Sequence, residues 1–252
     1  MPPEADASTE AVLYESRDRV AIITINNPAK ANSINADVAL GLAAAWRRFN
    51  ASDDRVAVVT GAGEKAFSAG ADLDAPPELR RFMPGVGIKV EKPIIAAVSG
   101  WCVGGSVVLV QMCDLCIASE TARFSYPEAK LGFTGGLISS LATRIPHKVA
   151  MEFILMGEPM TAQRAYEVGF VNKVVPAGQH LAEAEAWARK LAGMAPLVLT
   201  TLKRFVGEAL PRGPSEQAGR ALADIEAVWG SDDYREGLAA FKAKRPPDYN
   251  GR

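Results

Sequence analysis

The first half of the chain alternates short apolar runs with segments whose apolar residues recur at helical spacing. The run Val20–Asn26 is rich in β-branched residues and ends at Asn27-Pro28, which predicts a buried strand and a turn. Asn35 can cap a helix that runs to about Asn50. Further strands are predicted over Val56–Thr60, Pro93–Ser99, Leu115–Ser119 and Arg123–Tyr126, and a further helix over Gly104–Met112. Strands separated by helices indicate βα crossovers, and therefore an α/β fold with a largely parallel sheet.

The second half is dominated by helical periodicity. Helices are predicted over Leu137–Arg144, Lys148–Met156, Ala162–Val168, Leu181–Met194, Leu197–Leu210, Glu216–Val228 and Asp232–Lys244. The clearest break is Leu210–Pro214, and Ser231 supplies a capping side chain for the last helix. The pattern therefore predicts an α/β core followed by a mostly helical C-terminal region.

One apolar segment is unusually long. From Ile94 to Cys113, 20 consecutive residues carry no charge, which is long enough for a membrane span. Gly100, Gly104 and Gly105 interrupt it, and it has no matching basic flank. A strand, a glycine turn and a helix, all buried in a globular core, explain the run better.

Charge and composition narrow the classes of function. The 252 residues include 28 Lys and Arg against 29 Asp and Glu, so the net charge is −1 and gives no reason to expect nucleic acid or anionic lipid as a partner. The polar lead has no apolar signal segment, and the three cysteines are odd in number, so a reducing, cytoplasmic compartment is expected. Cys113-x-x-Cys116 could be a redox pair or half a zinc site, but buried, inert thiols and no metal are the favoured interpretation. His147 and His180 are unclustered, which disfavours a Ser-His-Asp triad.

A dinucleotide site is one candidate chemistry. Gly61-x-Gly63-x-x-Ala66 follows a predicted strand, and Tyr126-x-x-x-Lys130 has the spacing of a dehydrogenase Tyr/Lys pair. Both matches fail on context. The glycine fingerprint must open a helix, whereas the residues after Ala66 continue as a loop, and Pro127 places Tyr126 outside any helix that begins there.

An oxyanion hole built from backbone amides is the second candidate. The segments 66–73 and 101–106 each place small residues at a turn after a strand. Gly70, Gly104 and Gly105 let the backbone approach a ligand closely, and the last two would open a helix whose free N–H groups favour a developing negative charge. Tight turns alone would also explain these glycines. Glu128, after Pro127, could supply a carboxylate near such a site or could simply lie in solvent.

Taken together, these segments resemble the enoyl-CoA hydratase/isomerase family, also called the crotonase family, over nearly the whole chain. The motifs stand in the family's order: NNPAKANSI at 26–34, GEKAFSAGADL at 63–73, KPIIAAVSGWCVGG at 92–105, Cys113-Asp114-Leu115, FSYPEAKLG at 124–132 and DDYREGLAAFKAKR at 232–245. The resemblance implies a spiral core of ββα units over residues 1–190 and a helical C-terminal trimerisation region over 191–252. A homotrimer or a hexamer is the assembly it implies.

The resemblance also implies a substrate and the residues that bind it. The substrate would be an acyl-CoA thioester whose carbonyl oxygen lies between the N–H groups of Ala71 and Gly105, with coenzyme A as part of the substrate and no separate cofactor. Backbone at Ala29, Lys30, Ala31 and Ala69 would hold the CoA portion, and Lys65 would approach its phosphates. Two aimed N–H donors stabilise the enolate that forms when a proton leaves the carbon next to a thioester.

This sequence departs from the family's hydratases at one catalytic position. Those enzymes carry two glutamates; Glu128 fills the second position, and Val108 stands where the first belongs. Adding water needs one group to orient the water and another to deliver a proton, whereas one carboxylate can move a double bond. A one-base enoyl-CoA isomerase with Glu128 as base is therefore the leading expectation.

Two alternatives remain. The first is a hydratase, hydrolase or lyase in which Glu128 works with another group, the candidates being Asp74, Glu78 and Tyr126. The second is an acyl-CoA-binding member of the family without significant turnover. The loop 132–137 and the stretch 72–92 are shorter than is usual in the family, which reshapes the acyl pocket.

Overall fold

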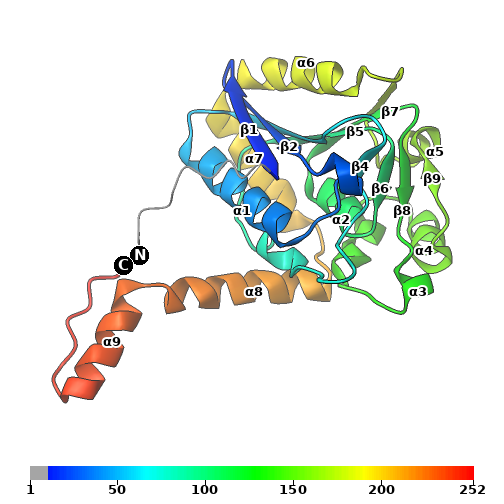
Figure 1. Ribbon diagram of the computed structural model, residues 1–252. Coiled ribbons are helices and arrows are strands. Elements are labelled where there is room, and N and C mark those ends of the chain that lie inside the picture. The colour runs from blue at the N-terminus through cyan, green and yellow to red at the C-terminus, as the bar shows by residue number, and fades with distance from the viewer. Residues whose placement is uncertain (1–10) are drawn as a thin grey trace.

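The computed structural model describes residues 11–252 and contains two β-sheets (Figure 1). The larger sheet has the strand order β1-β2-β3-β5-β7-β10. Its strands are β1 (Val12–Arg17), β2 (Val20–Ile25), β3 (Val56–Gly61), β5 (Ile94–Val98), β7 (Leu115–Ser119) and β10 (Lys173–Val175). β1 pairs antiparallel with β2, and the other neighbours pair in parallel. The predicted parallel sheet is confirmed, with one antiparallel edge strand added.

The smaller sheet has the order β4-β6-β8-β9 and consists of very short strands. These are β4 (Ala66–Ser68), β6 (Trp101–Val103), β8 (Arg123–Ser125) and β9 (Met160–Thr161). Strands β3, β5 and β7 of the larger sheet are each followed directly by a strand of the smaller one, and a helical segment comes next. This is the predicted spiral of ββα units. The residues after Ala66, predicted to be a loop, form part of strand β4 and open no helix.

Helices α1 (Ala36–Ala51) and α2 (Gly105–Met112) flank the main core. The Asn35 side chain accepts a hydrogen bond from the N–H of Val38 at 2.9 Å, which confirms the predicted cap of α1. The uncharged run Ile94–Cys113 forms β5, β6 and α2, and most of it lies in the protein interior: β5 and the first seven residues of α2 are all buried, whereas Trp101 of β6 is exposed. In the part of the chain that the structure describes, no helix is long and apolar enough to cross a bilayer.

The remaining short elements cover the smaller sheet and the sheet edges. They are the 3₁₀ helices η1 (Pro28–Lys30), η2 (Leu79–Arg81) and η3 (Leu137–Thr143), and the α-helices α3 (Glu128–Leu131), α4 (His147–Met156) and α5 (Ala162–Glu167). The segment Leu137–Arg144 was predicted as a helix and is the 3₁₀ helix η3. Helix α6 (His180–Ala192) lies on the outer face of the larger sheet, where its alanines Ala184, Ala188 and Ala192 pack on the apolar side chains of five strands.

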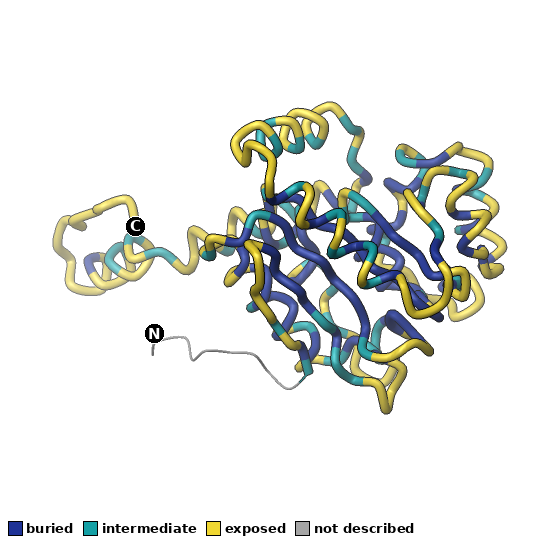
Figure 2. Tube along the Cα trace, turned by 90° about the horizontal axis from the view of Figure 1, so that it is seen from above, coloured by how far each residue is buried: buried dark blue, intermediate teal, exposed yellow. Residues whose placement is uncertain are grey.

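Three helices end the chain: α7 (Pro196–Ala209), α8 (Pro214–Trp229) and α9 (Asp232–Ala243). α8 runs along one side of the core, and α9 lies beyond it, away from the sheets (Figure 1). Most residues of these three helices, which together form a C-terminal arm over residues 196–243, are exposed, in contrast to the buried strands (Figure 2). Large apolar side chains contribute to its surface, among them Leu197 at 80% exposure, Trp229 at 59% and Phe241 at 84%.

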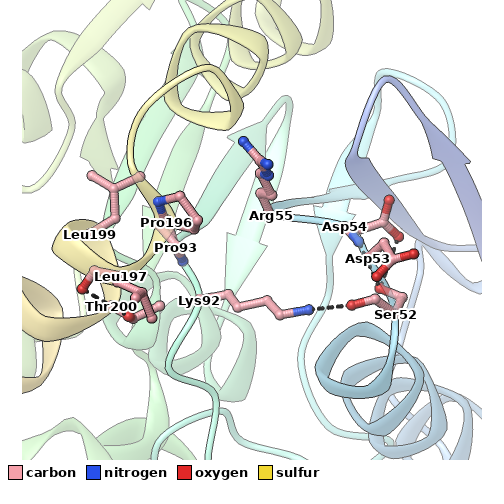
Figure 3. A pocket seen from close by; sticks show the side chains of 10 residues that line it. All are labelled: Ser52, Asp53, Asp54, Arg55, Lys92, Pro93, Pro196, Leu197, Leu199 and Thr200. Atoms are coloured by element: carbon pink, nitrogen blue, oxygen red, sulfur yellow. Dashed lines mark hydrogen bonds between the residues drawn. The ribbon is translucent and has the colours of Figure 1, made fainter.

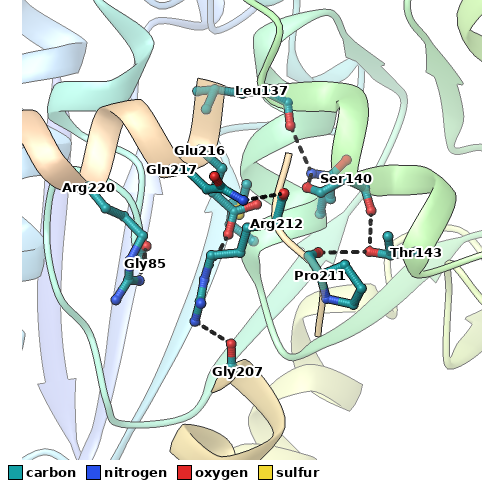
Figure 4. A network of polar contacts seen from close by, with 12 residues as sticks. Gly85, Leu137, Ser140, Thr143, Gly207, Pro211, Arg212, Glu216, Gln217 and Arg220 are labelled. Carbon is teal, nitrogen blue, oxygen red and sulfur yellow. Dashed lines mark hydrogen bonds and ion pairs between the residues drawn. The ribbon is translucent and has the colours of Figure 1, made fainter. Parts of the chain in front are cut away.

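The start of α8 is held to the core by polar contacts (Figure 4). Arg212 lies 3.5 Å from the buried Glu216 carboxylate, and Arg220 donates to the carbonyl of Gly85 at 2.7 Å. The hydroxyl of Thr143 in η3 donates to the carbonyl of Pro211 at 3.4 Å. These contacts fix α8 against η3 and against the segment that follows η2.

Candidate active site

Two glycine-containing turns lie against each other at the carboxyl ends of two paired strands of the smaller sheet. The first follows β4 and contains Gly70 and Ala71, and the second joins β6 to α2 through Gly104 and Gly105. A Cβ atom placed on Gly70 would lie 2.5 Å from the carbonyl oxygen of Val103 and 3.6 Å from the nitrogen of Gly105. The fold therefore brings together the two segments that the sequence predicted as an oxyanion hole.

The N–H of Ala71 is directed by the bridge that its turn makes with Ile34. The N–H of Ile34 donates to the carbonyl of Gly70 at 2.7 Å, and the N–H of Asp72 donates to the carbonyl of Ile34 at 3.0 Å. In such a parallel bridge the central residue's own N–H points to the other side of its strand. Among residues 11–252, no acceptor pairs with the N–H of Ala71.

Gly105 is the first residue of α2, so its N–H has no partner within the helix. Gly104, just before it, has a φ of +57° and donates its own N–H to the carbonyl of Ser125 at 2.8 Å. That bond fixes the turn to strand β8. The free N–H of Gly105 and the N-terminal end of α2 thus provide a second donor suited to a developing negative charge.

Glu128 lies beside this turn. A Cβ atom on Gly104 would be 2.9 Å from Oε1 of Glu128, so only a residue without a side chain leaves room for the carboxylate. Glu128 is 7% exposed, and within the described part of the chain its Oε2 is buried without a hydrogen-bond partner. Burial raises the pKa of Glu128 to about 7, against a smaller lowering by its own backbone N–H. A carboxyl group with such a pKa can give and take a proton near neutral pH.

Val108 lies on α2 with 1% of its surface exposed and is part of the main apolar core.

Asp74, Glu78 and Tyr126 are the groups that the sequence offered as possible partners of Glu128, and they lie in different surroundings. Glu78 is paired with Arg80 at 2.8 Å and with Arg81 at 2.9 Å, which lowers its pKa. Asp74 is exposed. The Tyr126 hydroxyl lies 3.3 Å from the hydroxyl of Thr134, and burial, with a smaller contribution from the charge of Glu128, raises the pKa of Tyr126.

Two of the segments predicted to contact CoA are joined by a backbone hydrogen bond. The N–H of Ala69 donates to the carbonyl of Ala31 at 2.9 Å, which joins the turn after β2 to the first oxyanion segment. Ala29 and Lys30 lie in η1, and their side chains are exposed. Lys65 is also exposed, and its carbonyl accepts the N–H of Trp101 at 3.1 Å. The structure therefore leaves the two lysines available to an anionic ligand.

A cavity of about 450 Å³ lies next to the glycine turns. Leu79 of η2 separates the two, because a Cβ atom on Gly105 would lie 2.9 Å from Leu79 Cδ2. The cavity continues past Leu79 and is bounded by Pro76, Pro77, Glu78, Leu79, Arg80, Phe133, Gly135, Leu137 and by Ser215, Ala218, Gly219 and Leu222 of α8. Glu78 and Arg80 of this lining are paired with each other, and the rest of the lining is mostly apolar, which suits an acyl group. No pattern in the sequence indicated that α8 would line this cavity.

The structure gives less support to the other chemistries considered from the sequence, which are a reactive cysteine pair, a dehydrogenase Tyr/Lys pair and a metal site. Cys102 and Cys116 are buried and Cys113 is half-buried; all three are free thiols whose pKa values burial raises, as expected for inert cysteines. Tyr126 precedes α3, so it shares no helical face with Lys130. Over residues 11–252, no cluster of three His, Cys, Asp or Glu side chains could hold a metal ion.

A second cavity, of about 260 Å³, is remote from the glycine turns (Figure 3). Arg55 and Lys92 line it just before β3 and β5, so it lies at the amino ends of strands whose carboxyl ends lead to the turns. Lys92 donates to the carbonyl oxygens of Phe49 and Ser52, each at 2.7 Å. Its ammonium group thus caps the end of α1.

Comparisons with known proteins agree with this geometry. The family model for enoyl-CoA hydratase/isomerase matches residues 15–81 and 87–252. A probable enoyl-CoA hydratase of Rhizobium meliloti is 36% identical, over 97% of this chain and 100% of that protein. (E)-benzylidenesuccinyl-CoA hydratase of Thauera aromatica is 34% identical, over 95% and 99%. The crystal structure of enoyl-CoA hydratase from Mycobacterium tuberculosis matches with a TM-score of 0.74 at 36% identity, over 96% and 100%.

The names of these relatives favour the hydratase alternative over the isomerase expectation. The chain itself departs from the two-glutamate pattern of the family's hydratases at Val108. The ββα spiral, the paired glycine turns and the match along almost the whole chain agree on one point: this protein belongs to the enoyl-CoA hydratase/isomerase family.

Proposed function

We propose that this protein hydrates the double bond of a 2-enoyl-CoA thioester, reversibly, with Glu128 as the acid and base. The observation that carries the proposal is the Glu128 carboxyl, buried beside Gly104 with a pKa of about 7. The unpaired N–H groups of Ala71 and Gly105 support it, because they can hold the thioester oxygen. The hydratase names of the relatives support the choice of reaction.

In the proposed reaction Glu128 alone carries out both proton transfers, in place of the two groups that the sequence led us to expect for the addition of water. Ionised Glu128 takes a proton from water as the water oxygen bonds to carbon 3 of the enoyl group. The electron pair of the double bond moves to the thioester oxygen, and the resulting enolate accepts hydrogen bonds from Ala71 and Gly105. Protonated Glu128 then delivers the same proton to carbon 2, which completes the addition of water and restores the carboxylate.

Double-bond isomerisation is the second candidate, and Val108 favours it. With an apolar side chain in place of the first glutamate, Val108 cannot help to orient water. In a 3-enoyl-CoA, Glu128 would take a proton from carbon 2 and return it to carbon 4 through a dienolate on the same two N–H groups. This route needs no water.

We also propose roles for the CoA-contacting surface and the arm. Lys30 and Lys65 are expected to attract the CoA phosphates, and the backbone at Ala29, Ala31 and Ala69 to contact the rest of that moiety. The apolar surface of α7, α8 and α9 supports self-association as a trimer or a hexamer. Light scattering on the purified protein measures the assembly directly.

Two substrates separate the candidate reactions. The purified protein is assayed with a 2-enoyl-CoA for hydration and with a 3-enoyl-CoA for isomerisation, each beside Glu128→Gln and the surface control Glu152→Gln. Hydration that falls about a hundredfold or more in Glu128→Gln alone supports the main proposal. Turnover of the 3-enoyl-CoA alone selects the isomerase. If neither substrate reacts while acyl-CoA binds, the protein is an acyl-CoA binder.

A further inference from the structure

Ser106 connects the two turns that carry the oxyanion donors. It follows Gly105 in α2, and none of its surface is exposed. Its Oγ lies 2.8 Å from the nitrogen of Val103, 2.8 Å from the carbonyl oxygen of Val103 and 2.9 Å from the carbonyl oxygen of Ser68. One hydroxyl group therefore reaches backbone atoms of both segments.

The two residues whose backbone Ser106 contacts lie just before the donors; its hydroxyl also lies 3.4 Å from Sγ of Cys102. Val103 ends β6, two residues before Gly105, and Ser68 ends β4, three residues before Ala71. Strands β4 and β6 pair in parallel, and their register shifts between Ala66 and Ser68. The Ser106 hydroxyl thus forms hydrogen bonds with the smaller sheet at the place where the regular pairing of β4 with β6 is interrupted.

The chemistry of a hydroxyl suits this position. Ser106 accepts a hydrogen bond from the N–H of Val103 and can donate its single hydrogen to either carbonyl. When the hydrogen goes to Ser68, the two turns are joined through one oxygen atom. Gly70 and Val103 are in contact at the same place, so a shift of one turn is passed to the other.

We propose that Ser106 is a positioning residue that sets the separation and direction of the Ala71 and Gly105 N–H groups. The inference rests on the proposed function, because it concerns the donors that hold the enolate. Stabilisation by such donors depends steeply on placement, and a displacement of about 1 Å can cost about a hundredfold in rate. Alanine at this position would leave the N–H of Val103 without its hydroxyl acceptor.

The test compares Ser106→Ala with Ser140→Ala. Ser140, in η3, is an equally buried serine whose hydroxyl oxygen accepts a hydrogen bond from the side-chain amide of Gln111 at 2.9 Å. We expect Ser106→Ala to lower kcat by at least about tenfold while KM changes less than about twofold, since the CoA contacts stay intact. Ser106→Thr keeps the hydroxyl and should recover much of the loss.

A binding measurement separates this inference from the proposed reaction. Calorimetry gives the ratio of affinities for acetoacetyl-CoA, which forms an enolate, and for saturated butyryl-CoA. The ratio should fall about tenfold in Ser106→Ala and stay unchanged in Ser140→Ala, whichever reaction the protein catalyses. Equal kcat values and equal affinity ratios in the two variants would overturn the role of Ser106. Absence of turnover in the wild type, with the ratio falling as expected, would instead overturn only the proposed function.

Discussion

The carboxylate of Glu128 occupies the space that a side chain at Gly104 would take. A Cβ atom on Gly104 would lie 2.9 Å from Oε1 of Glu128, and the φ of Gly104 is +57°. The glycine next to the oxyanion donor therefore has two reasons to lack a side chain: its backbone conformation and its contact with the proposed acid and base.

Gly104→Ala separates these two reasons. Gly132 has a φ of +70° with nothing within 4 Å of a Cβ atom, so Gly132→Ala measures the backbone cost alone. We expect about 1 kcal/mol of lost stability in Gly132→Ala and more in Gly104→Ala, together with a loss of activity in Gly104→Ala only. Denaturant unfolding and enzyme assays on both variants check this, and equal effects would contradict the proposed contact.

The stability of the protein should depend on pH through Glu128. Burial raises the pKa of this carboxyl from 4.5 to about 7, so between these pH values the folded protein keeps a proton that the unfolded chain has lost. The contribution to stability is complete below pH 4.5, declines as the pH rises and is lost above about pH 7. Glu128→Gln should therefore gain up to about 3 kcal/mol relative to wild type between about pH 4 and pH 8. Unfolding curves at both pH values test this, and a constant difference would argue against a buried, neutral carboxyl.

The activity should also depend on the protonation of Glu128. It should increase as this carboxyl loses its proton, whereas the stability decreases. The proposed reaction begins with ionised Glu128, so kcat/KM is expected to rise with pH and to level off above about pH 7. A pH profile of kcat/KM reports the free enzyme and is the measurement required. A profile that is flat from about pH 5 to pH 8 would show that Glu128 does not act as the base.

Val108→Glu restores the carboxylate that the family's hydratases carry. If the missing group limits hydration, the ratio of hydration to isomerisation should rise about tenfold or more. Val108 is 1% exposed in an apolar core, so the variant should also lose a few kcal/mol of stability. Val108→Gln, which is neutral and similar in size, is the matched control. An unchanged ratio in a folded Val108→Glu would mean that hydration here does not depend on a second carboxylate.

Ala218→Leu should shorten the acyl groups that the protein accepts. Ala218 lines the cavity beyond Leu79, whereas Ala221 lies on the same helix outside that lining, so Ala221→Leu is the matched control. Because leucine would fill part of the cavity, kcat/KM for long acyl groups should fall about tenfold while that for a four-carbon group changes little. Identical chain-length profiles for the two variants would place the acyl group elsewhere.

The sequence by itself determined the α/β core, the helical C-terminal region and the order of the chemical segments. Strand β3 and helix α1 follow from local periodicity and a capping asparagine, which act over a few residues. Strand β1 was not predicted, because most of its residues are exposed and only its pairing with β2 defines it as a strand. The three-residue strands β4 and β6 are too short to carry a periodic pattern.

Only the tertiary structure decided how the chemical groups meet. The sequence marked Glu128 as a carboxylate in the right segment, but its buried state and raised pKa depend on Gly104, more than twenty residues earlier. The contacts of Ser106 with Ser68, and of Leu79 with Gly105, join residues from different turns of the spiral. Such contacts depend on the packing of distant segments, which local patterns do not encode, and they set the desolvation and the donor geometry on which the chemistry relies.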